Sequence, residues 1–276
     1  MEADLKSEYK GVKGLNALYR RLYAKHFTAI ADMHDVLRTK YLRMRFSVDH
    51  YRVVHIDKHR KEKRQLTRQK NKQLRQLPTT FQNYADVLEK LGYPIQLDFT
   101  PMTSEATQNA SPKIGIAPMA AHVGKIYPLN KMQHVVDLLL EDYPDATVYL
   151  FGNAKKEREQ LETVANNHSQ CKIVGDFAHS LKEEIELMRQ LNVMVCMDSA
   201  NMHLAALTST PVVSIWGQTH PYAGFIEDHI RDGVVQVELP CRPCSIYGNK
   251  QCQFGDYRCM NQIDELHIIK YIKRFL

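Results

Sequence analysis

Short apolar runs alternate with longer amphipathic segments from residue 113 to the end of the chain. Strands that alternate with helices in this way form β-α-β units and a parallel sheet. Residues 193–197 (VMVCM) are apolar at every position, as expected for a strand buried on both faces of a sheet. We therefore predict a complete doubly wound α/β domain over residues 113–276. Its strands are expected at 113–118, 146–151, 171–174, 193–197, 211–216 and 234–237, and its helices at 131–143, 155–167, 181–191, 201–207 and 264–275.

The first 97 residues carry fewer strand signals than the rest of the chain. Two strands with several helices do not make a stable sheet by themselves, so we expect part of an α/β domain here. Residues 98–112 (DFTPMTSEATQNASP) are polar and contain Pro, Ser and Thr, which indicates a linker. The predicted organisation is a partial domain at 1–97, a linker at 98–112 and a complete domain at 113–276. In the first domain, helices are expected at 14–26, 60–76 and 80–91, and strands at 27–33 and 53–56.

Composition and charge narrow the range of functions. Hydrophobic residues make up 44% and charged residues 25% of the chain, the balance of a globular protein. Neither a membrane-spanning apolar stretch nor an apolar leader at the start is present in the sequence, so a cytoplasmic location is expected. Residues 1–78 hold 20 Lys and Arg against 8 Asp and Glu. This basic part indicates either an anionic partner (nucleic acid, phosphorylated glycolipid or acidic membrane) or a solvated helix surface.

Polar side chains follow several of the predicted strands. Ligands of open parallel sheets bind beyond the carboxyl ends of the strands, where these side chains would meet. Asp198 and Ser199 stand where a strand turns into a helix, a favourable place for a phosphate, and His203 lies one turn further on. Lys125, next to Gly124, could balance the charge of a diphosphate. Taken one at a time, these residues also have purely structural interpretations. Asp198 could be a helix cap, Lys125 a surface lysine and His203 a buried histidine. Walker, GxGxxG, zinc-protease and serine-hydrolase motifs are absent from the sequence.

Four of the six cysteines cluster near the C-terminus. Their spacing, with one C-x-x-C pair, fits a structural metal such as Zn²⁺, reduced thiols in a packed loop, or a redox pair. A metal there would hold the loop together, because the loop is remote in sequence from the polar strand ends. Cys171 and Cys196 lie in apolar runs and are expected to be ordinary buried thiols. The clustered cysteines are Cys241, Cys244, Cys252 and Cys259.

Residues 197–219 (MDSANMHLAALTSTPVVSIWGQT) resemble the signature of the family 9 glycosyltransferases, the ADP-heptose:lipopolysaccharide heptosyltransferases. Residues 124–128 (GKIYP), 151–159 (FGNAKKERE) and 31–43 (ADMHDVLRTKYLR) are similar to further segments of that family. The resemblance implies the GT-B fold, with two Rossmann-like domains. The C-terminal domain would bind the nucleotide-sugar and the N-terminal domain the acceptor. It also implies an inverting reaction without metal or other cofactor.

The resemblance assigns roles to individual residues. Lys125 and Asp198 become the catalytic candidates, Lys125 at the donor phosphates and Asp198 at the donor sugar. Glu157 would bind the ribose and His179 would lie beside the adenine. The diphosphate would be held by Ser199, by backbone N–H groups at Ala200 and by His203, and the acceptor side is represented by His34 and Arg38.

The chain also departs from the family pattern. Ala200 replaces a glycine and Tyr127 replaces a tryptophan. The family's first strand and its Gly-Asp loop, whose Asp is the proposed general base, have no counterpart here, so we expect a truncated N-terminal domain.

The leading hypothesis is transfer of a heptose, or a related sugar, from an ADP-sugar to the lipopolysaccharide inner core. The acceptor would be a lipopolysaccharide core or a lipid A-linked molecule, with peripheral contact at the inner face of the inner membrane. The alternative is an inactive nucleotide-sugar-binding protein. Nucleic acid is not expected as a partner, because residues 60–75 lack interleaved aromatics and any RNA or DNA motif.

Overall fold

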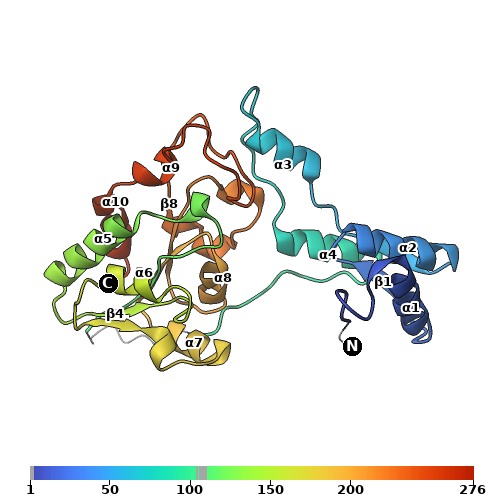
Figure 1. Ribbon diagram of the computed structural model, residues 1–276, viewed down its shortest axis with the longest axis horizontal. Coiled ribbons are helices and arrows are strands. Elements are labelled where there is room, and N and C mark those ends of the chain that lie inside the picture. The colour runs from blue at the N-terminus through green and yellow to red at the C-terminus, as the bar shows by residue number, and fades with distance from the viewer. Residues whose placement is uncertain (1–2, 104, 106–110) are drawn as a thin grey trace. The chain divides into compact units, whose positions relative to one another are not determined.

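Six parallel strands form the sheet of the larger of the chain's two units (Figure 1). The computed structural model describes residues 3–103, 105 and 111–276. The strand order is β5-β4-β3-β6-β7-β8. All six strands predicted for this part of the chain are found, with the same or slightly narrower bounds. They are β3 (Lys113–Ala117), β4 (Thr147–Leu150), β5 (Cys171–Ile173), β6 (Val193–Met197), β7 (Val212–Ile215) and β8 (Val234–Val235).

Helices cover both faces of this sheet. One core cluster joins the strands to Met132 of α5, Leu161 of α6 and Ile268 of α10. The other joins them to Met188 of α7 and Met202 of α8, and successive residues of β6 alternate between the two clusters. The doubly wound α/β architecture is therefore confirmed. These helices are α5 (Leu129–Asp142), α6 (Arg158–Ala165), α7 (Leu181–Met188), α8 (Ala200–Ala206) and α10 (Glu265–Ile272), with the short α9 (Arg258–Asn261) before the last.

The centre of the sheet fixes where a ligand can bind. β3 pairs with β4 on one side and with β6 on the other, so the chain winds outward from β3 in both directions. The carboxyl ends of β3, β4 and β6 therefore surround a crevice between diverging connections. Gly115 of β3 leaves room for the side chains of Leu191 and Met194. A Cβ at this position would lie 2.5 Å from side-chain atoms of both residues.

The smaller unit comprises Met1–Lys61 and Pro78–Phe99. Its two strands are parallel, in register from Ala29 opposite Arg52 to Asp32 opposite His55. Both strands were predicted. Its elements are α1 (Gly11–Tyr23), β1 (Ala29–Asp32), α2 (Leu37–Val48), β2 (Arg52–His55) and α4 (Thr80–Lys90), and α3 (Arg60–Thr67) begins in it.

Helix α2 was not predicted from the sequence. Its apolar residues do not repeat at helical spacing, and Leu37 and Val48 at its two ends are 84% and 68% exposed. Helix α3 is shorter than predicted, because it ends at Thr67 rather than near residue 76. Asn71 adopts a positive φ of 50°, which an α-helix does not accommodate.

Residues Glu62–Leu77, which we call the basic arm, belong to the larger unit. Leu66 and Leu77 pack with Ala223 in a separate buried cluster. The backbone N–H of Leu77 donates to the carbonyl of Tyr222 at 2.9 Å, and Lys72 Nζ donates to the Pro243 carbonyl at 2.9 Å. The sequence had placed this segment within the N-terminal domain at 1–97. Part of the predicted linker at 98–112 lies outside the described residues.

Candidate functional site

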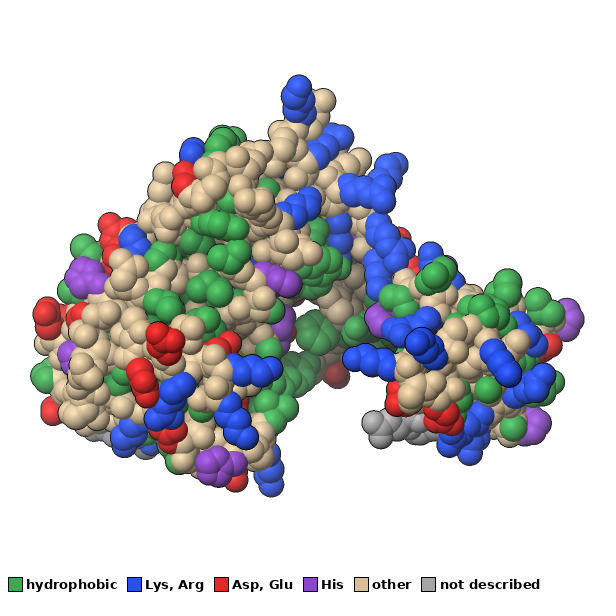
Figure 2. Space-filling model, in the orientation of Figure 1, with side chains coloured by type: hydrophobic (Ala, Val, Ile, Leu, Met, Phe, Trp, Pro, Cys, Tyr) green, Lys and Arg blue, Asp and Glu red, His purple; other side chains and the backbone are tan. Residues whose placement is uncertain are grey.

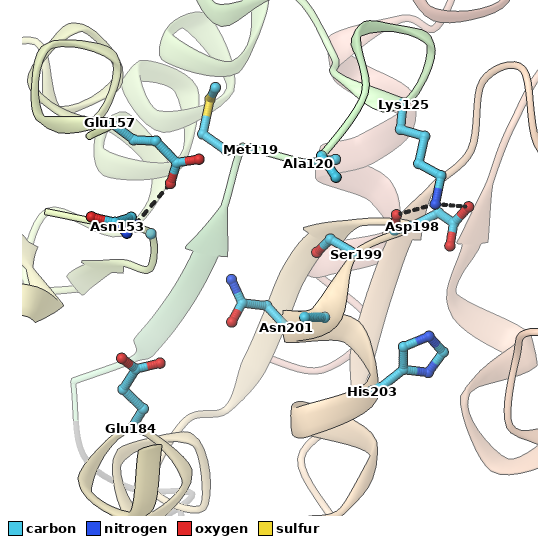
Figure 3. A pocket seen from close by; sticks show the side chains of 13 residues that line it. Met119, Ala120, Lys125, Asn153, Glu157, Glu184, Asp198, Ser199, Asn201 and His203 are labelled. Atoms are coloured by element: carbon cyan, nitrogen blue, oxygen red, sulfur yellow. Dashed lines mark hydrogen bonds and ion pairs between the residues drawn. The ribbon is translucent and has the colours of Figure 1, made fainter. Parts of the chain in front are cut away.

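A pocket of about 640 Å³ opens beyond the carboxyl ends of β3, β4 and β6 (Figure 3). Its position is the one that the winding of the sheet predicts. It brings together six of the residues singled out in the sequence: Lys125, Glu157, Asp198, Ser199, Ala200 and His203. The rest of the lining consists of Met119, Ala120, Ala121, Gly152, Asn153, Glu184 and Asn201.

Lys125 and Asp198 form a close ion pair at one side of this pocket. Lys125 Nζ lies 2.9 Å from Asp198 Oδ2 and donates to the Asp198 carbonyl at 3.0 Å (Figure 3). Both side chains are largely buried, so the pair is little screened by water. Gly124 allows this arrangement, because a Cβ there would collide with the buried side chain of Gln218. The ammonium group is thus fixed at the end of β6.

Ser199 and His203 lie at the start of α8 and one turn along it. The hydroxyl of Ser199 is buried and has no hydrogen-bond partner among the described residues. His203 Nδ1 lies 2.9 Å from Glu227 Oε1. This hydrogen bond raises the pKa of His203, against the opposing effect of burial. The pocket therefore holds an unused hydroxyl next to two groups that favour an anion.

The opposite side of the pocket is closed by the loop after β4. Glu157 Oε2 accepts a hydrogen bond from the backbone N–H of Asn153 at 2.7 Å, which fixes the carboxylate toward the pocket rim (Figure 3). Glu184 of α7 also lines the pocket, and burial raises the pKa of its carboxyl group. Glu184 was not among the predicted site residues, because its place on a regular helix gives no sequence signal.

Three predicted site residues lie elsewhere. His179 is exposed before α7, where its backbone N–H donates to Glu183 Oε2 at 2.7 Å, and it does not line the pocket. His34 and Arg38 belong to the smaller unit, and both are exposed. His34 follows β1, where its backbone N–H donates to Asp32 Oδ1 at 2.9 Å.

Residues 16–257 match the model of glycosyltransferase family 9 (heptosyltransferase). The chain belongs to this family. A curated relative, lipopolysaccharide heptosyltransferase 1 of Campylobacter coli, is 27% identical over 161 residues. That match covers 55% of this chain and 44% of the relative, so it spans less than half of the relative's length.

Two solved structures share the fold of this family 9 chain. The glycosyl transferase family 9 protein of Veillonella parvula is similar with a TM-score of 0.63 and 19% identity, over 96% of this chain and 80% of that protein. The E. coli heptosyltransferase WaaC with ADP is similar with a TM-score of 0.60 and 14% identity, over 99% of this chain and 81% of that protein. These likenesses confirm the predicted α/β, GT-B-like fold class. The incompleteness of the N-terminal domain stays a prediction.

The loop that carries the four clustered cysteines of this family 9 chain, residues 241–259, is anchored by Arg242. Arg242 is 2% exposed, and its guanidinium donates to the carbonyls of Gly217, Val237 and Thr219 at 2.5, 2.5 and 3.0 Å. All six cysteines are free thiols, and burial raises the pKa of Cys259 to about 11. Within the described ranges, no three His, Cys, Asp or Glu side chains are grouped so that they could hold a metal ion.

Proposed function

We propose that this chain is a glycosyltransferase that moves a heptose, or a related sugar, from an ADP-sugar to the inner core of lipopolysaccharide. The buried, unpartnered hydroxyl of Ser199 beside the Lys125–Asp198 pair carries this proposal. A hydroxyl in this position needs an acceptor or donor from a ligand, and diphosphate oxygens satisfy both it and the lysine. Family membership and the names of the relatives support the same chemistry.

The reaction we propose is a direct, inverting displacement at the anomeric carbon without metal or cofactor. Lys125 stabilises the negative charge that builds on the departing diphosphate, a contribution that grows in the transition state. Asp198 holds Lys125 in place at 2.9 Å and faces the donor sugar. Glu157, oriented by Asn153, would receive the ribose hydroxyls. The adenine contact that the family resemblance assigns to His179 stays a prediction, because His179 does not line the pocket.

The acceptor side of the proposal involves the smaller unit and the basic arm. His34 and Arg38 are the proposed acceptor contacts. The basic arm exposes cations to solvent, visible as the Lys and Arg side chains over α3 in Figure 2. Phosphates of a glycolipid, or of lipids at the inner face of the inner membrane, would neutralise this charge. Among the described residues, no helix is both long and apolar enough to span a bilayer. The exposed cations of the arm are Arg64, Arg68, Lys70 and Arg75.

Titration calorimetry with ADP and ADP-heptose, followed by a transfer assay on heptose-deficient lipopolysaccharide, tests the proposal. Lys125→Ala should weaken ADP binding about 30-fold, because a hydrogen bond to a charged group contributes about 2 kcal/mol. Lys270→Ala, an exposed lysine of α10, is the matched control and should bind as the unchanged protein does.

The two measurements separate the proposed activity from its alternative. Donor binding together with transfer supports the glycosyltransferase. Donor binding without transfer identifies a nucleotide-sugar-binding protein that lacks activity. Failure of the unchanged protein to bind either ADP or ADP-heptose contradicts both. Flotation with vesicles rich in anionic lipid, compared with neutral vesicles, tests the membrane contact, which reversal of charge at Arg68 and Arg75 should weaken.

A further inference from the structure

Glu227 is a buried acid beside the pocket that the proposed reaction does not yet use. It stands just before the 3₁₀ turn Asp228–Gly233, and its side chain is only 11% exposed. Its Oε1 lies 2.9 Å from Nδ1 of His203. Its Oε2 is buried without a hydrogen-bond partner among the described residues. The His203 ring is therefore the partner that the structure gives to this carboxylate.

A buried carboxylate with half of its hydrogen-bonding capacity unused is costly, unless a positive charge compensates for the burial. His203 supplies that charge when its ring carries both protons. The other charged groups that face the ring are Asp198, which favours the protonated form, and Lys125, which opposes it. Because Lys125 is itself paired with Asp198, Glu227 is the main source of stabilisation, and it raises the pKa of His203.

The pairing also decides which ring nitrogen can meet a ligand. Glu227 occupies Nδ1, so Nε2 is the nitrogen left to donate a hydrogen bond. His203 lines the same pocket as Ser199 and Lys125 (Figure 3). It belongs to α8, the helix that follows β6 in the sequence. A neutral ring could donate from only one of its nitrogens at a time. A protonated ring donates to Glu227 and to a ligand together.

We propose that Glu227 is a positioning residue that keeps His203 doubly protonated, so that its Nε2–H donates to the diphosphate of the nucleotide-sugar. This inference rests on the proposed function. When the bond between the anomeric carbon and the diphosphate oxygen breaks, its electron pair stays on that oxygen. The hydrogen bond from Nε2 strengthens as this charge develops, while the proton remains on His203. Asp198 and Glu227 thus each position one cation of the site.

The decisive variant is Glu227→Gln, which keeps the size and the hydrogen-bond acceptor and removes the charge. NMR titration of the His203 ring in the ligand-free protein, assigned with His203→Gln, should show a lower pKa in Glu227→Gln than in the unchanged protein. Calorimetry with ADP from pH 5.5 to 8 should show about fivefold weaker binding by the variant at pH 7.5, because a hydrogen bond from a protonated ring is roughly twice as strong as one from a neutral ring. The difference should shrink toward pH 5.5, because acid favours the protonated ring in both proteins.

A merely structural role would weaken ADP binding by the same factor at every pH. Asp228→Asn is the matched control, because this neighbouring acid pairs with Arg231, is 84% exposed and should leave both readouts unchanged. An unaltered titration of His203 in Glu227→Gln, or a binding difference that does not depend on pH, overturns the role of Glu227. If the unchanged protein binds no ADP, the proposed function and the diphosphate contact fail together, while the ring titration still decides whether Glu227 sets the charge of His203.

Discussion

The two units of the chain bury their sheets to very different extents. In the larger unit every residue of β6 and β7 is buried, between helices on both faces. In the smaller unit only one residue of the two strands is buried. Its core consists of a small cluster under the sheet and of buried side chains on α1 and α2, such as Leu18 and Phe46. Burial of apolar surface is the main driving force of folding, so the larger unit should be much the more stable. The candidate site is therefore built on the more rigid of the two sheets.

Equivalent leucine truncations give the largest expected effects and compare the two cores directly. Leu150→Ala in β4 should cost about 3 to 4 kcal/mol, because the residue is completely buried and its truncation leaves a cavity in the core. Leu91→Ala in the smaller core should cost about 2 kcal/mol at the transition of the smaller unit. Urea unfolding, followed by hydrogen exchange at residues of each unit, measures both. Equal losses would show that the two cores do not differ as their burial indicates.

Leu66→Ala tests to which unit the basic arm belongs energetically. Leu66 is fully buried with Leu77 and Ala223, so its truncation should cost about 2 to 3 kcal/mol. The loss should fall on the unfolding of the larger unit, although residue 66 lies early in the chain. Leu74→Ala, at an exposed position of the same arm, is the control. A loss confined to the smaller unit would contradict the assignment.

Acid should lower the stability of the two units in separate pH ranges. Burial, with smaller effects of Arg242 and Lys72, lowers the pKa of His220 to about 4, and its Nδ1 accepts the backbone N–H of Tyr222. The folded state then binds fewer protons than the unfolded state. The larger unit should therefore lose about 2 kcal/mol as pH falls from about 6.5 to 4. His220→Gln should flatten this slope in denaturant titrations at several pH values.

The smaller unit should respond only at lower pH. Burial opposes the ionisation of Asp35, but the hydrogen bond and charge of Arg60 outweigh it and lower the pKa of this carboxyl group. A lowered carboxyl pKa contributes stability that is complete above the ordinary value and is lost as pH falls through the lowered value. Asp35→Asn should reduce this late loss, and the part that remains should reflect Asp32, whose pKa is also lowered. If the smaller unit loses stability between pH 6.5 and 4 while the larger unit does not, the proposed order is wrong.

The smallest effect is expected at an exposed ion pair of the smaller unit. Arg21 and Glu8 lie 3.5 Å apart, and both side chains are more than half exposed. Because solvent screens such a pair, Glu8→Gln should change stability by less than about 0.5 kcal/mol in thermal unfolding. A larger loss would mean that surface charge supports the smaller unit in place of its limited core.

The sequence allowed accurate prediction wherever burial leaves a continuous apolar run. The run VMVCM became β6, and the helix predicted at 181–191 is present as α7. Lys125, Asp198 and Ser199 were placed together because the ends of parallel strands meet at one edge of a sheet. The apolar runs predicted the strands, and the polar residues after them predicted the position of the pocket. No knowledge of side-chain contacts was needed.

Features set by contacts between distant residues could not be read from the sequence. The basic arm is held by two buried leucines and by hydrogen bonds to residues about 150 positions away, while its composition resembles that of the N-terminal part. Glu227 meets His203 across 24 residues, and no local pattern marks this acid. His220 carried no sign that its ring would be buried next to Arg242.

The insertion of the basic arm has a consequence for how the chain is made. The chain passes from one unit to the other three times, after residues 61, 77 and 99. During synthesis the arm emerges well before Ala223 and the loop around Pro243, against which it packs. Leu66 and Leu77 therefore await their partners while most of the larger unit is still to be translated. A fragment that begins at residue 100 would lack the basic arm, and the apolar surface around Ala223 would be exposed. Such a fragment would be expected to aggregate more readily than the full chain.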